Sequence, residues 1–398
     1  MAVAFALSST SAISAAASDP TDEQITRLQT RVHEQPRDFI ALARLGQLFI
    51  SQVRRTGNLS LYANAEQAFL AAFAEFPDDP GALSGLGAVR MALHRFSEAR
   101  ELAGKILRRD SASIEGRLLL GDAELALGHT EVADGIFRAL PESPASFARL
   151  AELASLRGDN EEALRLMLRA ADESEARADA PESIAWFHVR AGEMLFRVGK
   201  FGAAREQYDV ACRHFDGYHT AEHVAELRAA EEKFDDAIAR YEPLIAQSER
   251  PDLQQTLGDL YVFMRKPEQA KPWHKKALAG YLASVARGEV HFIHHLAGFY
   301  ADVREDGAEA VKWARSDLEL RQTPGAHEAL AWALYRAGNF AESREQIDAA
   351  LASGIRDAHI FYHAGLIISA AGDIERGQKF LRETTVLNPR YGNFHVHR

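Results

Sequence analysis

The chain has 398 residues, of which 47% are hydrophobic and 26% charged, and its formal net charge is −11. This composition excludes a disordered chain, a collagen and a coiled coil, and the excess of acidic residues argues against nucleic acid as a partner. No apolar run reaches about 18 residues, so no transmembrane helix is expected, and the single cysteine, Cys212, excludes an internal disulfide and a cysteine-based zinc site.

Residues 1–18 carry no charged side chain and are rich in alanine and serine. The segment resembles a degenerate bacterial export signal, with an apolar run at 2–7 and the small residues Ala15 and Ala17 before a candidate cleavage site. The positively charged residues that begin an export signal are missing, so a disordered alanine-rich tail is the alternative. We expect an exported protein, periplasmic or secreted, in preference to a cytoplasmic one.

A capping helix is predicted next, over residues 19–35. Ile25, Leu28 and Val32 recur there at helical spacing. A helix in this place would cover the first unit of the repeat array that begins at residue 36, and such an array needs a polar end cap.

From residue 36 onward one pattern recurs through almost the whole chain. Its marker is a small residue in the middle of a predicted helix, and successive markers lie 33–34 residues apart in most intervals and 40–41 apart in three. The markers are Gly46, Gly87, Gly121, Ala151, Gly192, Ala225, Gly258, Gly298 (or Ala297), Ala331 and Gly365.

Three further positions keep this register. Seven residues after the marker a glycine is frequent, which can adopt a positive φ and end a first helix. Twelve residues after the marker comes a small residue, and sixteen after it a large apolar one, both on the inner face of a second helix. The unit is therefore a helical hairpin, repeated about ten times.

This pattern resembles the tetratricopeptide repeat (TPR) family over residues 36–390. The resemblance implies an all-α fold, a right-handed superhelical α-solenoid of about ten hairpins, in which first helices line the concave face. We expect one curved rod in which each unit touches only its neighbours. The eighth unit departs from the pattern, because its register is ambiguous by one residue near Asp306.

The tail at 391–398 is too short to form a cap helix over the last unit. We therefore expect this end of the solenoid to pack on a partner or on a second copy of the chain, which would make the protein a homo-oligomer. Phe380, Leu381 and Val386 would supply the exposed apolar face.

The concave groove is the predicted binding site, for a peptide or protein partner. Its middle is expected to be acidic and to attract a basic segment, and its C-terminal end to be aromatic and rich in histidine. An ordinary solvated face is the alternative interpretation of the same residues. The candidate groove residues are Glu193, Glu226, Asp259, His294, His295, Phe299, Glu328, Trp332, Tyr335, Tyr362 and His363.

The repeats occupy nearly the whole chain and leave no room for a catalytic domain, so we predict a non-enzymatic interaction scaffold without catalytic residues or cofactors. The alternative is a periplasmic protein that binds a metal or small ligand through its histidine-rich C-terminal repeats. His291 and His295, and likewise His359 and His363, are spaced i, i+4 and can share a metal ion. No carboxylate completes a recognised ligand pattern in the sequence, so no metal is predicted.

Overall fold

The structure, a computed structural model, describes residues 20–396, and the segment at 1–18, the candidate export signal, lies outside this range. Within 20–396 the chain forms helices and no strand. Helix α1 (Pro20–Glu34) packs on α2, and ten consecutive hairpins follow. Their helices are α2 (Phe39–Thr56) with α3 (Leu61–Glu75), α4 (Pro80–Ala92) with α5 (Phe96–Arg109), α6 (Ile114–Ala126) with α7 (Thr130–Arg138), α8 (Pro144–Leu156) with α9 (Asn160–Ala176), α10 (Pro181–Arg197) with α11 (Phe201–His214), α12 (Tyr218–Ala230) with α13 (Phe234–Ser248), α14 (Pro251–Phe263) with α15 (Pro267–Ala286), α16 (Ile293–Gly298) and the π-helical turn η1 (Phe299–Val303) with α17 (Gly307–Leu320), α18 (Pro324–Arg336) with α19 (Phe340–Leu351), and α20 (Ala358–Ala370) with α21 (Ile374–Leu387).

The predicted turn position is confirmed in every unit where a glycine occupies it. A left-handed backbone ends the first helix there, because it turns the chain toward the second helix within three residues. The glycines with positive φ at this position are Gly128, Gly158, Gly199, Gly338 and Gly372.

The small marker residues let the large residue sixteen positions later pack directly on the first helix. A Cβ atom added at Gly365 would lie 2.6 Å from a methyl carbon of Leu381, and one added at Gly192 would overlap the ring of Tyr208. Both helices of each hairpin therefore approach closely across a glycine or alanine, as the repeat pattern predicts.

The π-helical turn explains why the register of the eighth unit is ambiguous. A π turn accommodates one extra residue inside a helix, and η1 begins directly after Gly298. Ala297 is buried, whereas a Cβ at Gly298 would meet no atom within 4 Å. Ala297 is therefore the small packing residue of this unit, and η1 absorbs the additional residue.

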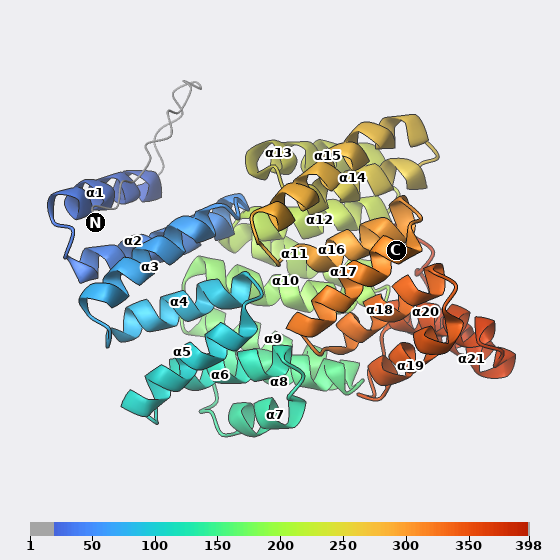
Figure 1. Ribbon diagram of the computed structural model, residues 1–398, viewed down its shortest axis with the longest axis horizontal. Coiled ribbons are helices and arrows are strands. Elements are labelled where there is room, and N and C mark those ends of the chain that lie inside the picture. The colour runs from blue at the N-terminus through green and yellow to red at the C-terminus, as the bar shows by residue number, and fades with distance from the viewer. Residues whose placement is uncertain (1–19, 397–398) are drawn as a thin grey trace.

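The expectation that each unit touches only its neighbours is wrong, because the superhelix winds back on itself. The turn inside one hairpin contacts the loop that begins the hairpin six units later. Asn160 Nδ2 donates to the carbonyl of Arg356 at 2.8 Å, Gln322 N donates to the carbonyl of Ala126 at 3.3 Å, and the ring of His94 lies 5.5 Å from that of His294. Figure 1 shows the resulting body, in which α2 of the first unit lies beside α12 and α13.

After α21 the part of the chain that the structure describes turns back, and Phe394 is buried in the core formed by α12, α13 and α14. On α21 itself the side chain of Val386 is 76% exposed, and packing of this face on a second copy stays a prediction. None of the helices between residues 20 and 396 is long and apolar enough to cross a membrane.

Candidate peptide-binding groove

The acidic middle of the groove is largely paired with basic groups of the chain itself. Glu193 on α10 accepts a hydrogen bond of 2.6 Å from Arg190 and lies 3.0 Å from Nε2 of His223 on α12. Asp259 on α14 lies 2.8 Å from Nε2 of His274. The same kind of pair links successive units elsewhere on the inner face, at Asp122 with Arg149 and at Glu152 with Arg190.

These pairs change the protonation behaviour of their members. Burial opposes ionisation of Glu193, but Arg190 and His223 outweigh it and hold the pKa of this carboxyl well below its usual range. Burial likewise opposes charge on His223, yet Glu193 raises the pKa of this imidazole to about 9. At neutral pH both groups are therefore charged, and Glu193 is not a free acid available to a basic ligand.

The aromatic end of the groove is a stacked set of rings on α18 and α20. The Trp332 ring lies parallel to the His363 ring at 3.8 Å between centroids, and the Tyr335 ring stacks on that of Trp332 at 5.0 Å between centroids. The indole Nε1 donates to Asp302 at 2.9 Å. Tyr362 lies at the rim, 38% exposed, with its ring 5.1 Å from that of Tyr391.

Phe299, a predicted groove residue, is a core residue instead. Its side chain is 1% exposed and packs edge-on against Tyr281. The π-helical turn hides the packing residue of this unit, Ala297, so Phe299 stands two residues after it, a position that is buried in other units, as at Leu227 and Ile367. Its neighbour His295 stacks on Tyr281 at 6.2 Å, and His294 takes part in the contact with His94 between superhelical turns.

The groove holds the chain's own C-terminal segment, residues 391–396, which we call the tail segment. The amide of Val396 donates to the Glu226 carboxylate at 2.8 Å, and Asn393 Nδ2 donates to the carbonyl of Ala230 at 2.8 Å. Phe394 is 3% exposed, with its ring 5.7 Å from that of Phe263. The tail segment therefore lies across the first helices α12 and α14, and Tyr391 extends its contacts to α20.

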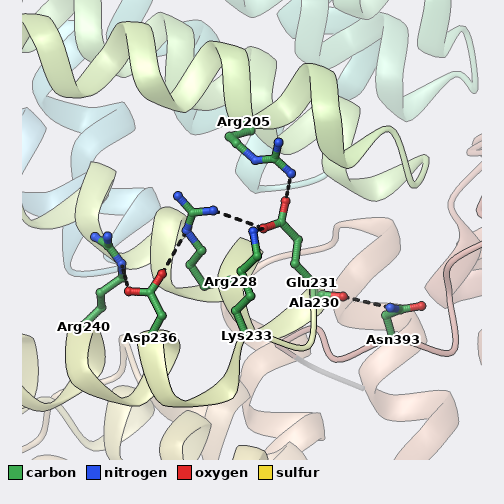
Figure 2. Close-up of polar contacts among 8 residues, drawn as sticks. All are labelled: Arg205, Arg228, Ala230, Glu231, Lys233, Asp236, Arg240 and Asn393. Atoms are coloured by element: carbon green, nitrogen blue, oxygen red, sulfur yellow. Dashed lines mark hydrogen bonds and ion pairs between the residues drawn. The ribbon is translucent and has the colours of Figure 1, made fainter.

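Figure 2 shows how the turn that receives Asn393 is held in place. Glu231 is bound by three cations at the α12–α13 turn, namely Arg205, Arg228 at 3.2 Å and Lys233 at 2.9 Å. Asp236 forms ion pairs with both Arg228 and Arg240. This network fixes the backbone around Ala230, so its carbonyl is a rigid acceptor for the tail segment.

Two clusters of histidine and glutamate lie on the groove face, and sequence reasoning assembled neither. One is Glu193 with His219 and His223, and the other is Glu328 with His359 and His363. In each, one ligand atom from every residue lies within 4.8 Å of the others. In both clusters the two histidines lie six and two residues before the marker, which is Ala225 in the first cluster and Gly365 in the second. This shared position relative to the marker is the sequence signal from which the two clusters could have been predicted.

Comparison with known proteins gives likeness in shape only. No family model and no curated protein matches the chain. Among solved structures, yeast Tom70 is 14% identical with a TM-score of 0.40, covering 92% of this chain and 88% of Tom70. Cut9–Hcn1 of the APC/C is 14% identical with a TM-score of 0.37, covering 93% of this chain and 87% of its own. An IFIT1 monomeric mutant with Gppp-AAAA is 12% identical with a TM-score of 0.38, covering 91% of this chain and 76% of its own.

The fold assignment rests on the chain's own geometry. The period of 33–34 residues, the left-handed turn at one fixed position and the packing of successive hairpins are all present between residues 36 and 390. In fold the chain is a tetratricopeptide-type α-solenoid of ten hairpins.

Proposed function

We propose that this protein is a non-enzymatic interaction scaffold that binds a peptide segment of a partner protein along its concave groove. The tail segment carries this proposal, because it is a short peptide without helix or strand that already contacts α12, α14 and α20. It uses the three kinds of contact that a peptide ligand needs, namely a buried aromatic anchor, hydrogen bonds from backbone and side chain, and ring contacts at the rim.

The same contacts define the chemistry of the partner. Phe394 is buried in the core of α12, α13 and α14, with its ring 5.7 Å from that of Phe263. On either side of it, Asn393 donates to the Ala230 carbonyl and the amide of Val396 donates to the Glu226 carboxylate, both on α12. A partner segment would thus present an aromatic side chain flanked by hydrogen-bond donors. A run of basic residues is not required, because most acids of the groove are already paired.

The test uses the full-length chain with its tail segment weakened. In the variant Phe394→Ala with Asn393→Ala, the tail loses its anchor and its bond to Ala230. A labelled synthetic peptide of residues 391–398 should bind this variant, as measured by fluorescence anisotropy. It should bind the unmodified chain at least about tenfold more weakly, since the attached tail competes at a high effective concentration.

The control is the same peptide with alanine in place of its phenylalanine, which should bind neither protein. Circular dichroism shows whether the variant keeps its helices. One contrary outcome is a helical variant that binds both peptides equally, and the other is a helical variant that binds neither. In either case the groove does not recognise the aromatic tail peptide, and the proposed function is wrong.

A further inference from the structure

The Glu328 cluster brings together three metal-ligating side chains from two neighbouring units. His359 and His363 lie one helical turn apart on α20, and Glu328 reaches them from α18, the first helix of the preceding unit. His363 Nδ1 is hydrogen-bonded to Oε1 of Glu328, and Nε2 of His359 lies 3.7 Å from the same oxygen. Glu328 and His363 are buried, at 8% and 4% exposure.

The rings are held in orientations that suit metal binding. Nδ1 of His359 shares a hydrogen bond of 3.2 Å with the hydroxyl of Tyr391, which leaves Nε2 facing Glu328. The His363 ring is clamped in parallel stacking against Trp332. The hydrogen bond with Tyr391 is an outer contact of the kind that fixes the tautomer and orientation of a metal-ligating histidine, and the stacking holds the ring orientation of His363.

The electrostatics of this cluster favour a cation. Between residues 20 and 396, the ion-pair partners of Glu328 are His359 and His363, with no lysine or arginine. Two further carboxylates lie close to the cluster. Asp302 accepts a hydrogen bond from the indole of Trp332, whose ring stacks on His363, and Asp357 accepts one from the backbone amide of His359. The Glu193 cluster differs, because the guanidinium of Arg190 already neutralises its carboxylate.

From this geometry we propose that Glu328, His359 and His363 bind one divalent transition-metal ion of the zinc class. Two imidazoles and one carboxylate are a ligand set that zinc prefers, and three protein ligands leave one coordination position open. The tail segment borders this cluster, since Tyr391 contacts Nδ1 of His359 and the His395 ring lies 6.3 Å from the His359 ring. The proposal does not depend on whether the groove binds a partner.

The test is a titration of the chelator-treated full-length protein with zinc, followed by calorimetry, and with Co²⁺, followed by its visible absorption. One ion per chain should bind, and bound Co²⁺ should show the intense d–d bands of tetrahedral coordination. Glu328→Gln, which keeps size and shape, should weaken zinc binding at least about tenfold, and His359→Gln with His363→Gln should abolish it.

The matched control is His219→Gln with His223→Gln, which alters the equivalent pair of the Glu193 cluster and should leave zinc affinity unchanged. Circular dichroism confirms that each variant is folded. Unaltered zinc affinity in the Glu328 and His359/His363 variants would overturn the proposal. Loss of binding in the control variant alone would overturn it as well, since the ion would then belong to the other cluster.

Discussion

In nine of the ten units the residue seven positions after the marker, counted from Gly298 in the eighth unit, adopts a left-handed backbone whatever its side chain, whereas Val53 of the first unit is helical. Five units have a glycine there, and four have a larger residue with φ between 52° and 62°, namely His94, Glu232, Arg265 and Glu305. This conformation costs an ordinary L-residue roughly 1–2 kcal/mol, because Cβ crowds the following carbonyl oxygen. The packing of the two helices therefore imposes the turn, and the side chain at this position tolerates it.

Replacing Glu232 with glycine should stabilise the protein. Glu232 is exposed and has φ of 62°, so glycine relieves the backbone strain and removes no buried contact. After subtracting the greater chain entropy of glycine when unfolded, we expect a gain of about 0.5–1 kcal/mol. The midpoint of urea unfolding should rise accordingly. An unchanged or lower midpoint would show that the turn at Glu232 is not strained.

Several histidines are buried in the neutral state, which makes stability depend on pH. Burial lowers the pKa of His94, His219 and His363 to about 3, against 6.5 for the unfolded chain. Between these values the unfolded chain binds more protons than the folded one, so the stability is complete above pH 6.5 and is lost as the pH falls. His223 acts in the opposite sense, because its raised pKa removes stability as the pH rises toward 9.

Lowering the pH from 7.5 to 5.5 should therefore destabilise the fold. His359, whose pKa burial also lowers to about 3, adds to these three histidines. Each of the four loses about 1.4 kcal/mol per pH unit below 6.5, whereas His223 adds about 1.4 kcal/mol between pH 7.5 and 5.5, so the combined loss is roughly 4 kcal/mol at pH 5.5. Urea unfolding at the two pH values measures this loss. His94→Asn is the control, since asparagine tolerates the left-handed turn, and it should reduce the loss by about a third. An identical pH dependence in this variant would contradict the assigned role of His94.

At the scale of the element, the repeat pattern was sufficient to predict the hairpins. The marker, the turn glycine and the large residue sixteen positions on correspond to real packing contacts, as between Gly365 and Leu381. The pattern could not locate the π-helical turn, because an extra residue in a helix has no characteristic side chain. Phe299 was misplaced for this reason, while the ambiguity between Ala297 and Gly298 was its visible trace in the sequence.

The predicted groove residues share a helix face by their periodicity, but their contacts could not be predicted from the sequence. A periodic position tells which side of a helix a residue occupies, so Glu226 and Tyr362 could be named as groove residues from the sequence. It does not tell which residue of the next helix meets them, and therefore Glu328 was not joined to His363, 35 residues away. The tail segment could not be foreseen either, since its bonds use the Ala230 carbonyl, a group that every residue has.

For the whole molecule, the contacts between superhelical turns make the solenoid more than a sum of neighbouring units. Two of these contacts use a backbone carbonyl as the acceptor, that of Ala126 for Gln322 and that of Arg356 for Asn160, and each joins units six apart. Backbone groups leave no signature in the sequence, which is why a simple curved rod was expected. The contacts should couple distant units, so that damage at one of them spreads to the other.

Two glycines at the same repeat position separate this coupling from local strain. Gly158 and Gly338 both have φ near 80°, so alanine imposes a similar backbone strain of about 1 kcal/mol at each. A Cβ at Gly338 meets open space, whereas one at Gly158 would overlap the carbonyl oxygen of Gly354 in the next superhelical turn. Gly158→Ala should therefore cost roughly 1–3 kcal/mol more than Gly338→Ala. Hydrogen exchange should also show faster exchange at 353–360 in Gly158→Ala, some 200 residues from the change, but not in Gly338→Ala. Equal unfolding free energies, with 353–360 equally protected in both variants, would mean that the two superhelical turns touch without stabilising each other.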